Sequence, residues 1–281
     1  MKKTTNKLKI FLYSVVGLTV LCTALFTISM FTAFDAEIGY FSNTKILPYI
    51  QTALMTVSVI SLISVMFLFP KKSLPADKAP DTAWGMFASL FCGFVFLGGT
   101  AIKFFSTYKS VANLSQFQKY MFTVIILSGL IAAVYFIIDA LTSSKKLLAL
   151  KVITGIFVII NLLVSIMFEH IDHLVPINAP RKTLLFLGFI SAAMFMVQEF
   201  RAKTDIILPK GYIFFGSATT LICASFSISG LVAHYAGAFK CSPFLVYYLT
   251  GLALAAYSSA KMFAYMKHVE EIDTDTQENE E

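Results

Sequence analysis

The chain has 281 residues, of which 57% are hydrophobic and only 14% are charged. Soluble domains typically contain roughly 45–50% apolar and about 25% charged residues, so the composition excludes an ordinary soluble fold. The net charge of +6 comes from cations scattered beside apolar segments, which argues against a nucleic-acid partner. We therefore expect an integral membrane protein surrounded by lipid.

Eight apolar runs follow one another along the chain, and each is long enough to cross a hydrocarbon core, which needs about 20 residues. The first run is longer than the roughly 7–15 apolar residues of a signal peptide. We predict an all-α polytopic fold of about eight transmembrane helices in a single membrane domain over residues 1–268. The runs are Ile10–Phe34, Ile46–Phe69, Ala83–Phe104, Tyr120–Leu141, Leu147–Phe168, Thr183–Phe200, Tyr212–Tyr235 and Phe244–Met266.

The cationic residues indicate how the spans are oriented. If eight spans alternate across the membrane, fifteen of the 22 lysines and arginines fall on the side of the termini and seven on the other side. Cytoplasmic loops carry the excess of Lys and Arg, so both termini are predicted to be cytoplasmic. Residues 269–281 carry acids without a basic residue and are expected to form a disordered cytoplasmic tail that is available to a protein partner.

The two halves of the chain can be aligned as an internal repeat. The stripe of Gly85, Ser89, Cys92, Phe96, Gly99 and Lys103 recurs 131 positions later as Gly216, Thr220, Cys223, Ser227, Gly230 and His234. Duplication predicts a parallel repeat of four plus four helices, in residues 1–142 and 143–268, related by an axis along the membrane normal. Chance similarity between apolar helices is the alternative.

Two ionisable residues occupy equivalent positions in the predicted halves. Asp139 in the fourth run and Lys261 in the eighth are 122 positions apart, which is the offset that aligns these runs. Charges within spans are costly and are usually paired or functional. We expect an ion pair or a gate between the halves, with separate snorkelling to the interface as the alternative.

Acids and histidines gather on the predicted outer side after the fifth run. His170, Asp172 and His173 are ligand types suited to zinc or another divalent metal, and His234 can supply a third imidazole. The spacing matches no zinc signature. A solvated helix end, or a histidine that responds to pH or relays a proton, are the alternatives, and no other cofactor is indicated.

The seventh run carries a stripe of small and polar side chains on one face. This stripe predicts either a polar path for a solute or proton, or a surface for close helix packing. Its members are Gly216, Thr220, Cys223, Ser227, Gly230 and His234.

The function favoured by these features is a small-solute or ion permease, or the membrane subunit of a transporter, and no motif indicates an enzyme. Twenty lysines against two arginines suggest a bacterial-type inner membrane. One alternative is a non-transport sensor or assembly protein that meets its partner through the outer loops or the acidic tail. The other is an intramembrane metalloenzyme built on the histidines.

Overall fold

A bilayer core offers no water to the peptide backbone, so apolar spans satisfy their own hydrogen bonds by becoming helices. The computed structural model describes residues 2–35, 40–42, 45–69, 74–75, 82–108, 114–142, 145–171, 179–204, 208–237 and 245–278. Its helices are α1 (Lys2–Thr32), α2 (Leu47–Leu62), α3 (Val65–Leu68), α4 (Ala83–Tyr108), α5 (Gln116–Leu141), α6 (Leu148–Ile171), α7 (Pro180–Lys203), α8 (Pro209–Tyr235) and α9 (Leu245–Glu278), with a 3₁₀ turn, η2, at Lys145–Leu147.

Six of these helices are long and apolar enough to cross a membrane. They are Thr5–Thr32, Ala83–Thr107, Gln116–Leu141, Leu148–Ile171, Pro180–Lys203 and Pro209–Tyr235. The all-α class and the multi-pass membrane character predicted from the sequence are thereby confirmed.

The other two predicted runs take different forms. The run Ile46–Phe69 is interrupted after Leu62, so it becomes the helices α2 and α3. The last run is the first part of α9, a helix of 34 residues that extends well past the apolar segment.

Two local features differ from the sequence-based expectation. The acidic segment from residue 269, expected to be disordered, continues α9 as helix to Glu278. Val269 is buried there, and Glu270 pairs with Lys9 of α1 at 2.6 Å, so tertiary contacts hold this part of the tail to the bundle. A short antiparallel hairpin also follows α1, with β1 (Phe34–Asp35) paired to β2 (Tyr40–Phe41).

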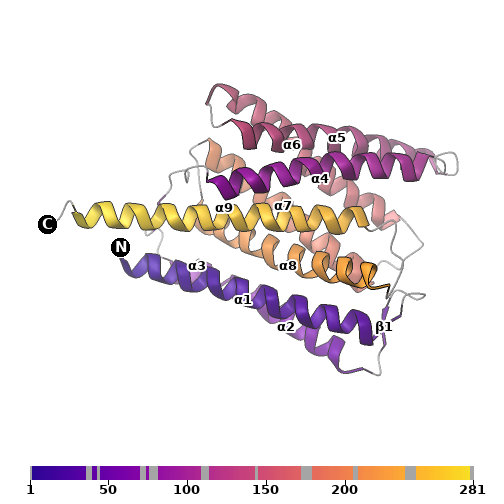
Figure 1. Cartoon of the computed structure of the whole chain (residues 1–281), viewed down its shortest axis with the longest axis horizontal. Helices are drawn as coiled ribbons and strands as arrows, with labels where there is room; N and C mark the ends of the chain where they lie inside the picture. The colour runs from indigo at the N-terminus through magenta and orange to yellow at the C-terminus, as the bar shows by residue number, and fades with distance from the viewer. Residues whose placement is uncertain are drawn as a thin grey trace.

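Helices α4 to α9 form a closed ring, in which each packs against its neighbour in sequence and α9 returns to α4. In Figure 1, α4, α5 and α6 lie along one side of the bundle and α1 with α2 along the opposite side, with α8 and α9 between them. The beginning of α1 and the end of α9 lie at the same end of the bundle (Figure 1). Helix α1 covers α8 and α9 from outside the ring.

The predicted halves pack differently from one another. In the second half, α7 packs extensively on α8, whereas the corresponding helices α2 and α4 are not among the extensively packed pairs of the described residues. The first half is therefore split, with α1 to α3 on the periphery and α4 and α5 in the ring.

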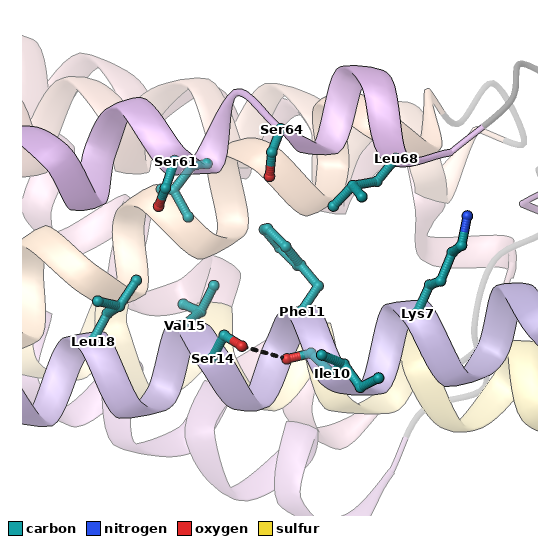
Figure 2. A pocket seen from close by; sticks show the side chains of 10 residues that line it. Lys7, Ile10, Phe11, Ser14, Val15, Leu18, Ser61, Ser64 and Leu68 are labelled. Carbon is teal, nitrogen blue, oxygen red and sulfur yellow. Dashed lines mark hydrogen bonds between the residues drawn. The ribbon is translucent and has the colours of Figure 1, made fainter.

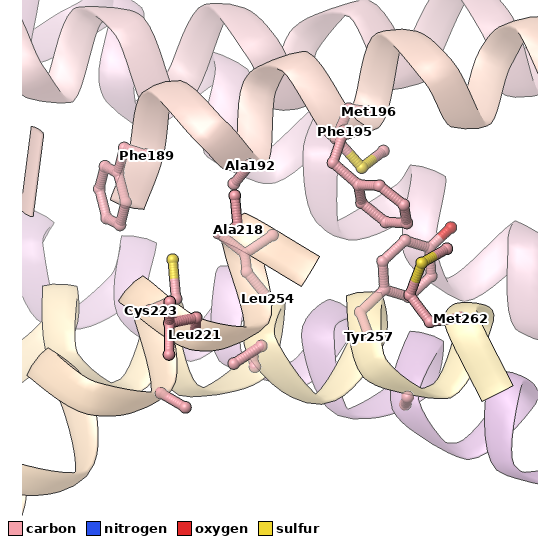
Figure 3. Close-up of a cluster of buried hydrophobic side chains, with 14 of the residues drawn as sticks. Phe189, Ala192, Phe195, Met196, Ala218, Leu221, Cys223, Leu254, Tyr257 and Met262 are labelled. Carbon is pink, nitrogen blue, oxygen red and sulfur yellow. The ribbon is translucent and has the colours of Figure 1, made fainter. Parts of the chain in front are cut away.

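Apolar side chains from α7, α8 and α9 fill the middle of the bundle. Figure 3 shows Phe189 and Phe195 of α7 pointing toward the helices that carry Leu221 and Tyr257, which are α8 and α9. Phe195 and Tyr257 lie with ring centroids 6.3 Å apart. Lipid is as apolar as these side chains, so close packing rather than the hydrophobic effect holds helices together in a membrane.

Gly230 is a point where this packing admits no side chain. A Cβ at Gly230 would lie 2.3 Å from the Tyr248 ring of α9, and Tyr248 is itself 1% exposed. We expect Gly230→Ala to lower the free energy of unfolding by about 1–3 kcal/mol through overpacking. Thermal melting in detergent measures this loss of stability as a lower melting temperature.

Gly98→Ala is the matched control, because nothing lies within 4 Å of a Cβ at Gly98. Equal melting temperatures for the two alanine variants would contradict the close approach of α8 and α9.

Candidate functional site

Asp139, near the end of α5, is the centre of a group of buried charges. Its Oδ1 atom pairs with Nζ of Lys203 in α7 and lies 3.4 Å from Nζ of Lys151 in α6. Its Oδ2 atom lies 3.7 Å from Nζ of Lys261 in α9. One carboxylate therefore connects four helices of the ring.

A second carboxylate, Glu199 of α7, shares two of these lysines. Its Oε1 atom lies 3.4 Å from Nζ of Lys261 and 3.7 Å from Nζ of Lys203, one turn along the same helix. The two acids are thus joined through two ammonium groups. We call Asp139, Lys151, Glu199, Lys203 and Lys261 the five-charge cluster.

Hydroxyl groups complete the surroundings of the two carboxylates. The Tyr257 hydroxyl lies 3.3 Å from an oxygen of Asp139 and 3.3 Å from an oxygen of Glu199, in position to donate to either. Ser89 of α4 donates to Asp139 at 3.2 Å, and Tyr212 of α8 donates to Glu199 at 2.9 Å. All six helices of the ring contribute to this site.

The lysines have further partners of their own. Lys203 donates to the Tyr135 hydroxyl at 2.8 Å and also lies over the ring of this tyrosine. Lys151 donates to the main-chain carbonyl of Thr142, which follows the last residue of α5. Such contacts satisfy ammonium protons that no water reaches.

The five-charge cluster is closed off, and the charges of its own five members do not cancel. The exposed fractions of its side chains run from 2% for Lys203 to 11% for Lys261. Three lysines against two carboxylates leave one excess positive charge when all are ionised. Buried charges are tolerated only when they are paired and hydrogen-bonded, and here the pairing leaves one proton in excess of neutrality.

A second group of charges lies at the other end of the same helices. Lys103 of α4 lies over the Tyr247 ring at 3.8 Å from its centroid and interacts electrostatically with Glu169 of α6. Lys182 of α7, with 0% exposure, donates to the main-chain oxygen of Glu169 at 2.7 Å. We call Lys103, Glu169 and Lys182 the second cluster.

Aromatic side chains separate the two clusters. Lys182 and Glu199 are 17 residues apart on α7, roughly 25 Å at 1.5 Å per residue. In between, Phe189 of α7 packs on Tyr247 with ring centroids 6.0 Å apart, and Phe136 of α5 packs on Tyr257 at 5.2 Å. The ring is therefore occupied by charges near each end and by aromatic rings between them.

The structure brings together the two residues that the repeat singled out, Asp139 and Lys261. The sequence analysis counts Lys151 and Lys203 among the topology signals on the side of the termini, and it does not single out Glu199. The available signal was the pair Glu199 and Lys203, four residues apart at the end of an apolar run, where opposite charges face one another on a helix.

The small-residue stripe of α8 faces α9. Thr220 and Ser258 share a hydrogen bond of 2.9 Å, and a Cβ at Gly216 would lie 2.6 Å from the Met262 sulfur. The aligned stripe of α4 also meets α9, since Cys92 donates to the Ala253 carbonyl at 3.1 Å. These contacts are those of close helix packing, and the polar path stays a prediction.

The structure also places the remaining members of the α8 stripe. Cys223 and Ser227 are fully buried, and His234 is half-buried near the end of the helix with its ring beside Tyr235.

The predicted metal ligands are only partly described. His170 lies in the last turn of α6 with its ring 6.2 Å from that of Phe186, while Asp172 and His173 lie outside the described residues. Within the described part of the chain, no three His, Cys, Asp or Glu residues are grouped so as to hold a metal. The metal site and the metalloenzyme hypothesis stay predictions.

Comparison of the chain with protein-family models, curated proteins and solved structures gave no match. Its function is therefore argued from the geometry of the two clusters.

The pairing of Asp139 with Lys261 can be measured by a double-mutant cycle. We expect Asp139→Asn alone to destabilise by about 3–5 kcal/mol, because it leaves buried ammonium groups short of a partner. Lys261→Gln in the same chain should recover part of that loss, with a coupling energy of about 0.5–3 kcal/mol. Denaturant unfolding in detergent gives the four free energies.

The exposed pair Lys267 and Glu271, 3.7 Å apart, provides the comparison. The cycle of Lys267→Gln and Glu271→Gln should give a coupling below about 0.5 kcal/mol. Additive effects at Asp139 and Lys261 would show that the buried contact has no energetic role.

Proposed function

We propose that this chain is a proton-coupled permease for a small solute, or the membrane subunit of such a transporter. The observation that carries the proposal is the five-charge cluster inside the ring of α4 to α9. Charged groups buried away from water are costly, and replacing a buried ion pair by apolar side chains is often neutral or stabilising. Five such groups gathered in one place point to a role that apolar packing cannot fill.

Proton transfer fits the composition of the cluster. Loss of one proton makes three lysines and two carboxylates neutral overall, and regain of the proton restores the single positive charge. The Tyr257 hydroxyl lies within hydrogen-bond distance of both carboxylates, so it provides a short route between them. An anionic solute can balance the same excess charge, which favours acids over neutral solutes as substrates.

The two clusters are suited to closing a pathway from either side. Each cluster joins helices of the same ring. The aromatic contacts described between them, Phe189 on Tyr247 and Phe136 on Tyr257, are made by uncharged side chains. In the proposed cycle, opening one cluster admits the solute while the other stays closed. The conformation seen here is the occluded one.

The proposed topology has eight crossings and cytoplasmic termini. Helices α2 and α3 together, and α9, supply the two crossings beyond the six long apolar helices. Lys151, Lys203 and Lys261 are buried and do not act as loop charges. Without them, twelve of the fifteen cations on the side of the termini remain. Without the buried Lys182, six of the seven cations on the other side remain. The excess of cations on the side of the termini therefore persists, as expected for cytoplasmic termini in a bacterial-type inner membrane.

We also retain the duplication as a proposal, because the equivalent residues Asp139 and Lys261 meet. The different packing of the two halves then reflects later divergence, in which α1 to α3 moved to the periphery.

Proton movement can be tested in vesicles that contain the purified chain and a pH-sensitive dye. Under an imposed membrane potential, with a panel of organic acids, amino acids and sugars offered in turn, we expect at least one solute to accelerate lumenal pH change over empty vesicles. Asp139→Asn and Lys261→Gln should abolish that acceleration, because each removes a group that binds the proton or its counter-charge.

Lys267→Gln, which alters an exposed cation outside the ring, should retain the wild-type rate. Wild-type vesicles that stay indistinguishable from empty ones with every solute would favour the non-transport sensor or assembly protein.

A further inference from the structure

A groove of about 400 Å³ lies between α1 and the interrupted helix α2–α3, away from both clusters. Figure 2 shows Phe11, Val15 and Leu18 on one wall and Ser61 and Leu68 on the other. Most of the lining is apolar, and Lys7 stands at one end.

The interruption of the second apolar run shapes the upper wall of this groove. Ile63 and Ser64 keep right-handed helical dihedral angles, but the Ser64 amide bonds to the carbonyl of Ser61, three residues back, at 3.0 Å. The Ser61 hydroxyl donates to the Ser58 carbonyl at 2.7 Å. Serine side chains compete in this way with the helical hydrogen-bond ladder, and the local tightening separates α2 from α3.

The groove has the length of one membrane leaflet. Lys7 and Leu18 are eleven residues apart on α1, roughly 16 Å at 1.5 Å per residue. This is about half of a hydrocarbon core of roughly 30 Å. A second copy of a transmembrane helix would need a groove along the whole bilayer, so the dimensions favour a lipid chain.

The flanks of the groove are apolar and face outward from the bundle. Ile10 is 67% exposed and Phe67 is 84% exposed, and α1 to α3 lie outside the ring. Lipid can therefore enter sideways from the bilayer.

Lys7 marks the headgroup end. Among the described residues no carboxylate pairs with Lys7, whereas the nearby Lys9 pairs with Glu270 at 2.6 Å. An ammonium group beside an apolar groove at the membrane surface attracts anionic headgroups.

We infer that this groove binds an anionic phospholipid, with one acyl chain between α1 and α2–α3 and the phosphate at Lys7. The inference does not depend on transport, since neither cluster lines the groove.

Native mass spectrometry of the purified full-length chain with added phosphatidylglycerol or phosphatidylcholine tests this directly. Lys7→Gln should weaken phosphatidylglycerol binding about five-fold and leave phosphatidylcholine binding unchanged, as expected for the loss of one surface cation. Ser61→Phe should weaken binding of both lipids by about ten-fold or more, because an aromatic ring would occupy the groove. Ser14→Phe, from the opposite wall, should do the same if Ser61→Phe does not fold.

The control for Lys7→Gln is Lys45→Gln, which removes an exposed cation at the other end of the bundle. The control for Ser61→Phe is Val57→Phe, because Val57 lies one turn from Ser61, is 63% exposed and does not line the groove. Neither should change lipid binding. Equal effects in Lys7→Gln and Lys45→Gln, or in Ser61→Phe and Val57→Phe, would overturn the proposal. So would loss of a dimer in Ser61→Phe without a change in bound lipid, because a second copy would then fill the groove.

Discussion

Asp139 accepts contacts from three lysines that come from three different helices, and much of the architecture can be understood from the cost of burying those charges. Water is excluded from the cluster, so each ammonium group depends on a carboxylate, a tyrosine or a main-chain carbonyl for its hydrogen bonds. These requirements fix α5, α6, α7 and α9 relative to one another at one end of the ring. Removing either carboxylate leaves buried ammonium groups short of a partner, which makes the arrangement both specific and sensitive to protonation.

The role of α9 follows from its neighbours. It carries Lys261 and Tyr257 into the five-charge cluster and Tyr247 into the second cluster, so one helix connects the two ends of the ring. The glycines of α8 bring α9 close enough for these side chains to reach their partners, as Gly216 does beside Met262 and Gly230 beside Tyr248. Close packing of α8 on α9 therefore also positions the side chains with which α9 reaches both clusters.

Length and hydropathy alone predict the six long helices, because a membrane leaves few alternatives for such runs. The repeat directed attention to Asp139 and Lys261, which lie 3.7 Å apart. Lys151 and Lys203 count as topology signals in the sequence because a cation near the end of an apolar run usually has that role, and only tertiary packing reveals that they are buried. The helical continuation past Val269 likewise depends on contacts with α1, which local sequence patterns do not reveal.

In the proposed cycle, the five-charge cluster holds the transported proton and opens to the side of the membrane that carries the termini while the second cluster stays closed. Ser89, which donates to Asp139, can be replaced by cysteine in a chain whose four native cysteines are alanine, and then exposed to a membrane-impermeant thiol reagent in oriented vesicles. We predict labelling of this cysteine from the side that carries the termini, at a rate that changes when the pH gradient is reversed. A residue that stays unreactive from both sides under every gradient and solute would show that the cluster is a permanent structural brace.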